Sequence, residues 1–259
     1  MALLYGKANI RMKAVFVLLF AMGQLLFAQD EIVRGDFVLR GHTLVHYLGK
    51  ADILIIPTNL GVTEIGKGAF NRSEVRQMRI PEGVIAITDD AFANSKLEAI
   101  QLPNSLRSIG DRAFYGCAGL SHISLPDSVN YIGYGAFANS GLTNITLPKN
   151  LNSIERSVFY GCEKLTYITL PDRLTEIGDS AFYKSGLTRI TFPQRLSSIG
   201  ANAFAQCHGL TGISLPASLV SLGDRAFAGC ERLQNIRHSI NTAIGYDAFL
   251  GVRGKPVLY

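Results

Sequence analysis

The sequence predicts a solenoid, in which the chain winds through many similar coils that stack on one another. Two residue types recur at fixed positions, in steps of 22 or 23 residues (24 once). Phenylalanine recurs at Phe70, Phe92, Phe114, Phe137, Phe159, Phe182, Phe204, Phe227 and Phe249. Eight of the nine prolines share a second register, at Pro57, Pro81, Pro103, Pro126, Pro148, Pro171, Pro193 and Pro216. Such a period is typical of arrays in which each unit buries its apolar edge only against its neighbours.

The composition fits one continuous core. Of the 259 residues, 47% are hydrophobic and only 17% are charged, below the usual quarter. The formal net charge is +5, but three of the basic residues fall in a predicted leader. The remaining 5 − 3 = +2 is too small to indicate nucleic acid or an anionic membrane as the partner.

Residues 1–28 resemble a secretion signal. Lys7, Arg11 and Lys13 precede a largely apolar run, residues 14–27, and Ala28 ends the predicted leader. Met12 is an alternative start, because Met12 and Lys13 followed by the run form a compact signal. A transmembrane anchor is the other interpretation, but the run of about 14 residues is shorter than the ~20 that a membrane span needs. We therefore expect cleavage, and no membrane span in the mature chain.

The remaining chain divides into three parts. Residues 29–50 carry loosely alternating apolar residues without a full repeat, and we expect one or two short strands that cap the first coil. Residues 51–250 form the array. Residues 251–259 leave the pattern, and Arg253 to Pro256 predict a polar terminator that keeps the last strand edge from pairing with another chain.

One unit, residues 120–141, illustrates the expected coil. The segment that begins at Leu120 ends with apolar residues at alternate positions, Ile123 and Leu125. This alternation indicates a strand, which Pro126 stops. A second short apolar segment ends at Gly133, where we expect a backbone conformation that other residues resist. The segment after Ala136 and Phe137 is expected to be a turn of helix or 3₁₀-helix. Stacked coils lie about 4.8 Å apart, so the phenylalanines should form one continuous spine.

The four cysteines are expected to be buried and reduced. Cys117, Cys162 and Cys207 recur every 45 residues, two coils apart. That spacing is about 9–10 Å, beyond the roughly 7 Å limit for a disulfide. Only Cys207 and Cys230 lie in adjacent coils, so their pairing stays open.

Alternation along each first strand predicts two columns of exposed residues. The first is Ile53, Gln77, Ala99, His122, Asn144, Tyr167, Arg189, Gly212 and Asn235. The second is Ile55, Arg79, Gln101, Ser124, Thr146, Thr169, Thr191, Ser214 and Arg237. Neither column contains an acid. The hydroxyl run fits strand propensity and cross-strand pairing as well as binding.

Within these columns we identify a candidate ligand-binding set. Its members are Arg79, Gln101, His122, Asn144, Tyr167, Arg189 and Arg237. Tyr and Arg are common interface anchors, and a surface without acids suits an acidic protein or a glycan. Ile53 and Ile55 form an apolar patch that the cap should cover; otherwise the patch is a contact site. Self-association through this patch or through the ends of the solenoid stays open.

The repeated string L-x-x-I-x-L-P-x-x-[LV]-x-x-I-G-x-x-A-F closely resembles the BspA-like, Treponema-type leucine-rich-repeat family. Leu165, Ile168, Leu170, Pro171 and Ile177 carry it in one unit, followed by Gly178, Ala181 and Phe182. The resemblance covers about residues 51–250. It implies an α/β repeat solenoid, a right-handed coil with a parallel sheet on the concave face and second short strands and helical or 3₁₀ turns on the convex side. It also implies a secreted or surface bacterial protein that binds macromolecules, often as an adhesin.

No pattern in the sequence indicates catalysis. His42 and His46 lack a third metal ligand, and no glycine follows a strand in a phosphate-binding loop. We therefore expect neither enzymatic activity nor a cofactor. The leading hypothesis is a secreted or surface-exposed binding module for a protein or glycan of a host matrix or neighbouring cell. The alternative is a periplasmic scaffold whose partner is another protein of the same cell, or itself.

Overall fold

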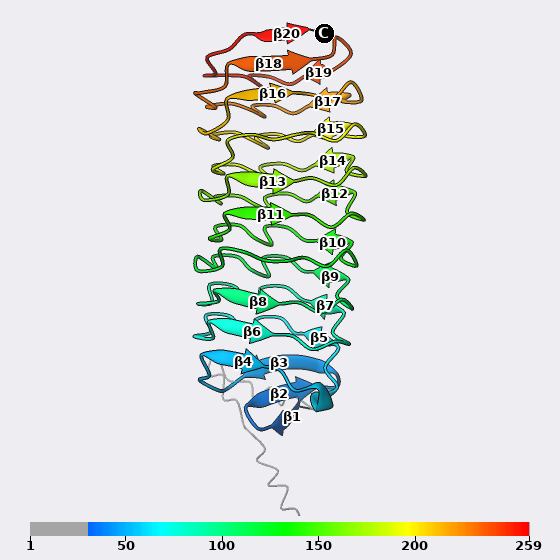
Figure 1. Cartoon of the computed structure of the whole chain (residues 1–259), viewed down its shortest axis with the longest axis vertical. Helices are drawn as coiled ribbons and strands as arrows, with labels where there is room; N and C mark the ends of the chain where they lie inside the picture. The colour runs from blue at the N-terminus through cyan, green and yellow to red at the C-terminus, as the bar shows by residue number, and fades with distance from the viewer. Residues whose placement is uncertain (1–30, 259) are drawn as a thin grey trace, which may run out of the picture.

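The computed structural model describes residues 31–258, so the predicted leader lies outside the described residues. Figure 1 shows a stack of coils along a nearly straight axis, with each coil lying directly over the one before it. The predicted solenoid is therefore confirmed. We call the surface made by the first strand of each coil the main-strand face.

Two series of parallel strands run along the stack, and the second series is divided into two sheets between β10 and β12. The main-strand sheets contain β4 (Ile53–Ile55), β6 (Gln77–Arg79), β8 (Ala99–Gln101), β11 (Asn144–Thr146), β13 (Tyr167–Thr169), β16 (Gly212–Ser214), β18 (Asn235–His238) and β20 (Pro256–Leu258). The second strands are β5 (Glu64–Ile65), β7 (Ala86–Ile87), β9 (Ser108–Ile109), β10 (Tyr131–Ile132), β12 (Ser153–Ile154), β14 (Glu176–Ile177), β15 (Ser198–Ile199), β17 (Ser221–Leu222) and β19 (Ala243–Ile244). Residues 121–125 and 188–192 form no strand, which divides the main-strand surface into three short sheets.

The N-terminal part forms three strands rather than the one or two expected. β1 (Glu31–Arg34), β2 (Phe37–Arg40) and β3 (Thr43–Tyr47) form an antiparallel meander, and β3 then pairs in parallel with β5. The meander thus extends the second-strand sheet. At the other end, β20 pairs with β18 and adds one strand to the main-strand surface.

The core is a column of stacked phenylalanine rings. All eight consecutive pairs from Phe70 to Phe249 are stacked, with centroids 5.0–5.7 Å apart and interplanar angles of 2–12°. Tyr47 and Phe37 continue the column into the cap. Such pairs add about 0.5–1.5 kcal/mol each beyond burial. The predicted spine is confirmed.

The segment around each phenylalanine is a pair of turns, so the expected helical or 3₁₀ turn is not confirmed there. Residues two before and two after each phenylalanine have positive φ, as at Asp90 (54°) and Asn94 (57°) around Phe92. Alternate amides bond locally and to the next coil: Ala91 N–H donates to Thr88 O, whereas Phe92 N–H donates to Ala113 O. In a helix, all these amides would donate to carbonyl groups of the same coil. In residues 31–258 the one helical segment is η1 (Thr58–Leu60), a 3₁₀-helix elsewhere in the first coil.

Gly133 and its equivalents have a different reason for being glycine from the one expected. None has a positive φ. Instead, a Cβ at Gly133 would lie 2.8 Å from Asp111 N, and one at Gly223 would lie 2.4 Å from Ala201 N. At these glycines the preceding coil's backbone therefore approaches too closely for a side chain, whereas Glu155 carries one at an equivalent position. The expectation of an unusual backbone conformation was wrong because the constraint acts between coils.

Candidate functional site

The main-strand face presents the two predicted columns to solvent. Backbone register pairs Ile53 with Gln77 and Gln77 with Ala99, and farther along pairs Asn144 with Tyr167. Of the eighteen column positions, seventeen are exposed and Gly212 is half-buried. The central residue of each strand points inward, as Ile145 and Ile168 do. The alternation predicted from the sequence is confirmed.

Four of the predicted binding residues form a continuous row across four coils. Asn144 Nδ2 lies 3.4 Å from His122 Nε2, and Asn144 is the register partner of Tyr167. The Arg189 guanidinium carbon lies 5.1 Å from the centroid of the Tyr167 ring. Thr169 Oγ1 donates a hydrogen bond of 3.5 Å to the Tyr167 hydroxyl from the neighbouring column. We call His122, Asn144, Tyr167 and Arg189 the central row.

The other three predicted residues lie away from the central row. Arg79 and Gln101 are register partners on β6 and β8, and together with Ile55 they line a shallow hollow of about 500 Å³. Arg237 lies on β18 opposite Ser214, toward the C-terminal end. The candidate set is therefore two groups and one distant member.

Ile53 and Ile55 are not covered by the cap. Their exposed fractions are 62% and 63%. The expectation that the cap covers them was wrong because β1–β3 extend the second-strand sheet, whereas these isoleucines belong to the main-strand sheet. They leave an apolar patch beside the hollow that Arg79 and Gln101 line.

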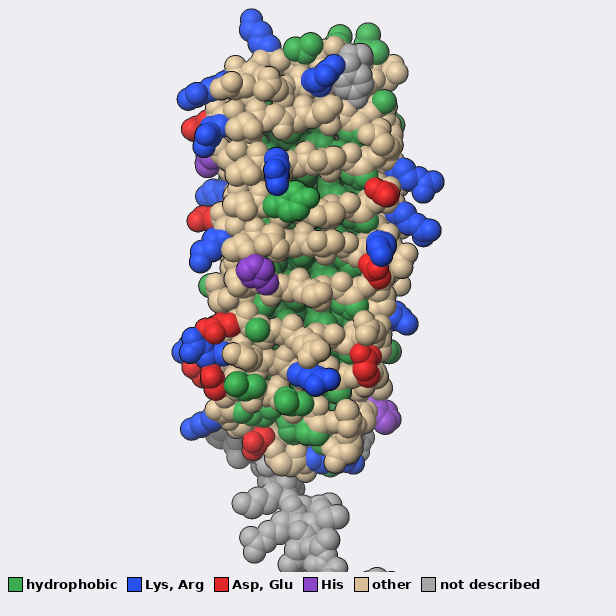
Figure 2. Space-filling view, viewed as in Figure 1, with side chains coloured by type: hydrophobic (Ala, Val, Ile, Leu, Met, Phe, Trp, Pro, Cys, Tyr) green, Lys and Arg blue, Asp and Glu red, His purple; other side chains and the backbone are tan. Residues whose placement is uncertain are grey.

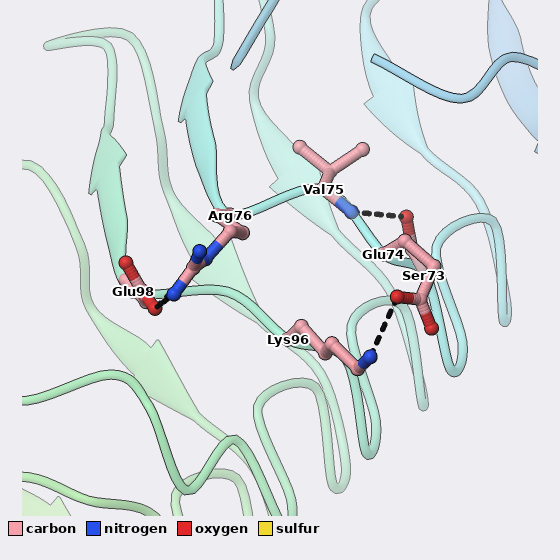
Figure 3. Close-up of polar contacts among 6 residues, drawn as sticks. All are labelled: Ser73, Glu74, Val75, Arg76, Lys96 and Glu98. Carbon is pink, nitrogen blue, oxygen red and sulfur yellow. Dashed lines mark hydrogen bonds and ion pairs between the residues drawn. The ribbon is translucent and has the colours of Figure 1, made fainter. Parts of the chain in front are cut away.

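Charge is unevenly placed on this face. Figure 2 shows isolated basic, histidine and apolar side chains over the strands, with acidic ones mainly at the margins. At one margin of the N-terminal coils, Lys96 Nζ lies 2.7 Å from Glu74, and Arg76 Nε donates to Glu98 Oε1 at 2.9 Å (Figure 3). These pairs join adjacent coils and neutralise one another. The two columns contain no carboxylate, so the positive charge of Arg189 in the central row is not neutralised by a residue of its own columns.

The remaining reactive groups serve the fold. His42 Nδ1 lies 2.8 Å from Gly61 O. Each cysteine is buried and free, and Cys117 Sγ donates to Phe92 O at 3.1 Å. Burial raises the pKa of Cys117 and Cys162 to about 11 and that of Cys207 to about 12. Such thiols are protonated and poorly nucleophilic at neutral pH. Within residues 31–258 no three His, Cys, Asp or Glu side chains lie close enough to hold a metal ion.

One aromatic group, in which Tyr160 is exposed and the other members are half-buried, was not predicted from the sequence. Tyr115, Tyr160 and Tyr183 directly follow phenylalanines of the spine and lie on the turn side of the coils. Tyr160 and Tyr183 stack with ring centroids 5.0 Å apart. Their shared repeat position, directly after a spine phenylalanine, is the sequence signal that identifies this group.

The fold and its exposed strand columns define a leucine-rich-repeat solenoid. The family model described as "BspA type Leucine rich repeat region (6 copies)" matches residues 50–162 and 131–253. The chain belongs to this family. No match was found among curated proteins.

Solved structures of bacterial leucine-rich-repeat proteins share the fold. A leucine-rich cell surface protein from Faecalibacterium prausnitzii is 24% identical, with a TM-score of 0.69 over 90% of this chain and 77% of that one. The T. pallidum leucine-rich-repeat protein is 24% identical, with a TM-score of 0.55 over 79% of this chain and 87% of that one. A third, from Eubacterium ventriosum, is 19% identical, with a TM-score of 0.54 over 83% and 68%. Among the described residues, no helix has the length and apolarity needed to span a membrane.

Proposed function

We propose that this protein is a non-enzymatic binding module, exported from a bacterial cell, that holds an acidic protein or glycan of a host matrix or neighbouring cell against its main-strand face. The observation that carries this proposal is the central row, where Tyr167 and Arg189 stand exposed on a surface whose columns contain no acid. An aromatic ring and a guanidinium in contact provide apolar area and charge at one point. The likeness to a cell surface protein supports the exported location.

The partner would contact a rigid surface. Each main strand is held from below by buried residues such as Ile145 and Ile168, which are 2% and 3% exposed. Its side chains therefore need little backbone reordering on binding, which reduces the entropic cost of association. Arg79, Gln101 and the apolar patch at Ile53 and Ile55 provide a second contact area on the same face for an extended partner.

The experiment compares two matched double variants in a pull-down from serum and matrix extracts. Arg189→Glu with Tyr167→Ala should abolish capture of the partner. Arg107→Glu with Tyr131→Ala makes the same chemical changes beside the second-strand sheet, where Tyr131 is 45% exposed, and should preserve capture. Capture that survives the first double variant would exclude the central row.

A second candidate is a periplasmic scaffold that binds a protein of the same cell or another copy of itself. The exposure of Ile53 and Ile55 favours this reading, since exposed apolar patches mark contact sites. Protease treatment of intact cells separates the two candidates. A surface module is removed by the protease, whereas a periplasmic scaffold is spared.

A further inference from the structure

The turn side of the central coils carries an aromatic ring with one uncovered face. Tyr160 stacks on Tyr183 of the next coil, with an interplanar angle of 10°. Its other face therefore looks toward the preceding coil. There the equivalent position is Ala138, whose methyl group is too short to cover a ring. One coil farther toward the N-terminus, the equivalent position is Tyr115, which lies two coils from Tyr160.

A hollow of about 380 Å³ lies over Ala138. Tyr115, Tyr134 and Tyr160 line it, together with Asn139, Arg112 and Arg156. Its floor is built of small residues, since Gly135 and Ala138 are both buried. The volume lies within the range of small-ligand sites, which combine aromatic walls with a few polar groups.

The spacing of the walls suits one ring. Equivalent positions two coils apart are separated by about 9–10 Å. A ring that packs between two walls needs about 3.5–4.0 Å on each side, or roughly 7–8 Å in all. A single six-membered ring therefore fits between Tyr115 and Tyr160. It makes its most extensive contact with the uncovered face of Tyr160.

The charge of the hollow is positive. The Arg156 guanidinium carbon lies 5.8 Å from the Tyr134 ring centroid, and that of Arg112 lies 4.7 Å from the Tyr115 ring centroid. Arg112 is partly neutralised by Asp90, with Nε 3.3 Å from Oδ1. Arg156 forms no salt bridge with any residue between 31 and 258. Arg156 is thus available to a ligand carboxylate, which guanidinium groups bind with two parallel hydrogen bonds.

We propose that this hollow binds an acidic sugar unit of a glycan, at a site separate from the main-strand face. The pyranose ring stacks on the uncovered face of Tyr160, because its polarised C–H groups are attracted to the negative face of the aromatic ring. The carboxylate of the sugar accepts hydrogen bonds from Arg156. Asn139, at the border of the hollow, offers an amide to the sugar hydroxyls.

The test is calorimetric titration of the purified protein with a glucuronic-acid tetrasaccharide and with its carboxyl-reduced glucose counterpart. We expect the acidic tetrasaccharide to bind at least tenfold more tightly. Arg156→Gln should weaken its binding at least tenfold, and so should Tyr160→Ala. Tyr160→Phe keeps the ring and should stay within twofold of the unmodified protein. Arg173→Gln removes an exposed charge from a different corner of the coil and serves as the control.

The outcomes are decisive in both directions. The proposal is overturned if the acidic tetrasaccharide does not bind, if the glucose counterpart binds equally well, or if Arg156→Gln has no effect. Equally tight binding of hexaglutamate would also overturn it, since a peptide does not need the free ring face. Thermal midpoints and circular dichroism check folding, and if Tyr160→Ala is unstable the exposed Arg156→Gln decides. The Arg189→Glu, Tyr167→Ala double variant should leave this binding unchanged, which separates this site from the main-strand proposal.

Discussion

The N-terminal coils and the central coils place different chemistry on one repeated frame. At the margin just before the main strand, the N-terminal coils carry the charged residues Arg76 and Glu98, which pair across coils. The central coils carry threonines there, and Thr166 Oγ1 donates to Thr143 O at 3.3 Å. On the strand itself, exposed isoleucine at the N-terminal end gives way to the central row. Because stacking fixes only the inward positions, the outward ones differ without any change in register.

The largest effect is expected from breaking the frame that both regions share. Phe159 is fully buried and stacks on Phe137 at 5.7 Å and on Phe182 at 5.3 Å. Phe159→Ala should lower the free energy of unfolding by about 3–5 kcal/mol and split unfolding into N-terminal and C-terminal blocks. Urea denaturation followed by hydrogen exchange measures both. An unchanged midpoint would refute the role of the spine, and Phe159→Leu is the milder control.

The second effect concerns the close approach of coils. Gly223→Ala should lower the free energy of unfolding by about 1–3 kcal/mol, since overpacked sites must shift the backbone. Its Cβ would lie 2.4 Å from both Gly200 C and Ala201 N. The matched control is Glu155→Ala, at an equivalent position that already carries a side chain. Equal thermal midpoints for the two variants would contradict the steric explanation.

The third prediction uses pH to separate the two regions, because the N-terminal coils have Ser73 and Ser95 where later coils have Cys117 and Cys162. The cysteine pKa rises from 9.0 in the unfolded chain to about 11 in the folded one. Below pH 9 both states hold the proton and stability is unaffected. Between pH 9 and 11 the unfolded thiols ionise first, so the free energy of unfolding falls, by about 1 kcal/mol per thiol at pH 10.

Hydrogen exchange at pH 7.5 and pH 10 tests this. The loss of protection should be confined to the central and C-terminal coils. The variant with Cys117→Ser and Cys162→Ser should lose less stability between these pH values, since a hydroxyl ionises far outside this range. An equal loss in the N-terminal coils would show that other groups cause the change.

The smallest effects should distinguish the two margins. Thr166→Val removes a hydrogen bond to Thr143 O and should cost about 0.5–1 kcal/mol. Glu98→Gln removes an exposed ion pair with Arg76 and should change the thermal midpoint very little, because water screens such pairs. Differential scanning calorimetry at low and high salt compares them. A larger loss for Glu98→Gln would mean that the charged margin stabilises the coils.

The inward half of this structure could be predicted from residue spacing alone. The periodic Phe137 and Pro126 positions identify the spine and the end of the main strand, and alternation around Ile145 places Asn144 on the surface. The features that residue spacing could not predict are those that depend on contacts between coils. Gly133 is constrained by the backbone of the coil before it, and Ile53 is exposed because the cap joins the other sheet.

The candidate sites show the same limit. The central row follows from register, so His122, Asn144 and Tyr167 were correctly placed in succession along one column. The hollow at Ala138 depends on which face of Tyr160 another ring covers, and a sequence does not specify ring faces. The turn segments escaped prediction because positive φ at residues such as Asp90 is decided by hydrogen bonds to the next coil.

The amides that bond from one coil to the next on the turn side also determine how the molecule would respond to force. With the two sheets, they give each coil hydrogen bonds to its neighbour on three sides. A pull along the axis must therefore detach a whole coil at once, and the terminal coils, held by a single neighbour, yield first. Each rupture would release about 22 residues, or roughly 73–79 Å of extended chain. Stretched between two surfaces, the protein would lengthen in regular steps.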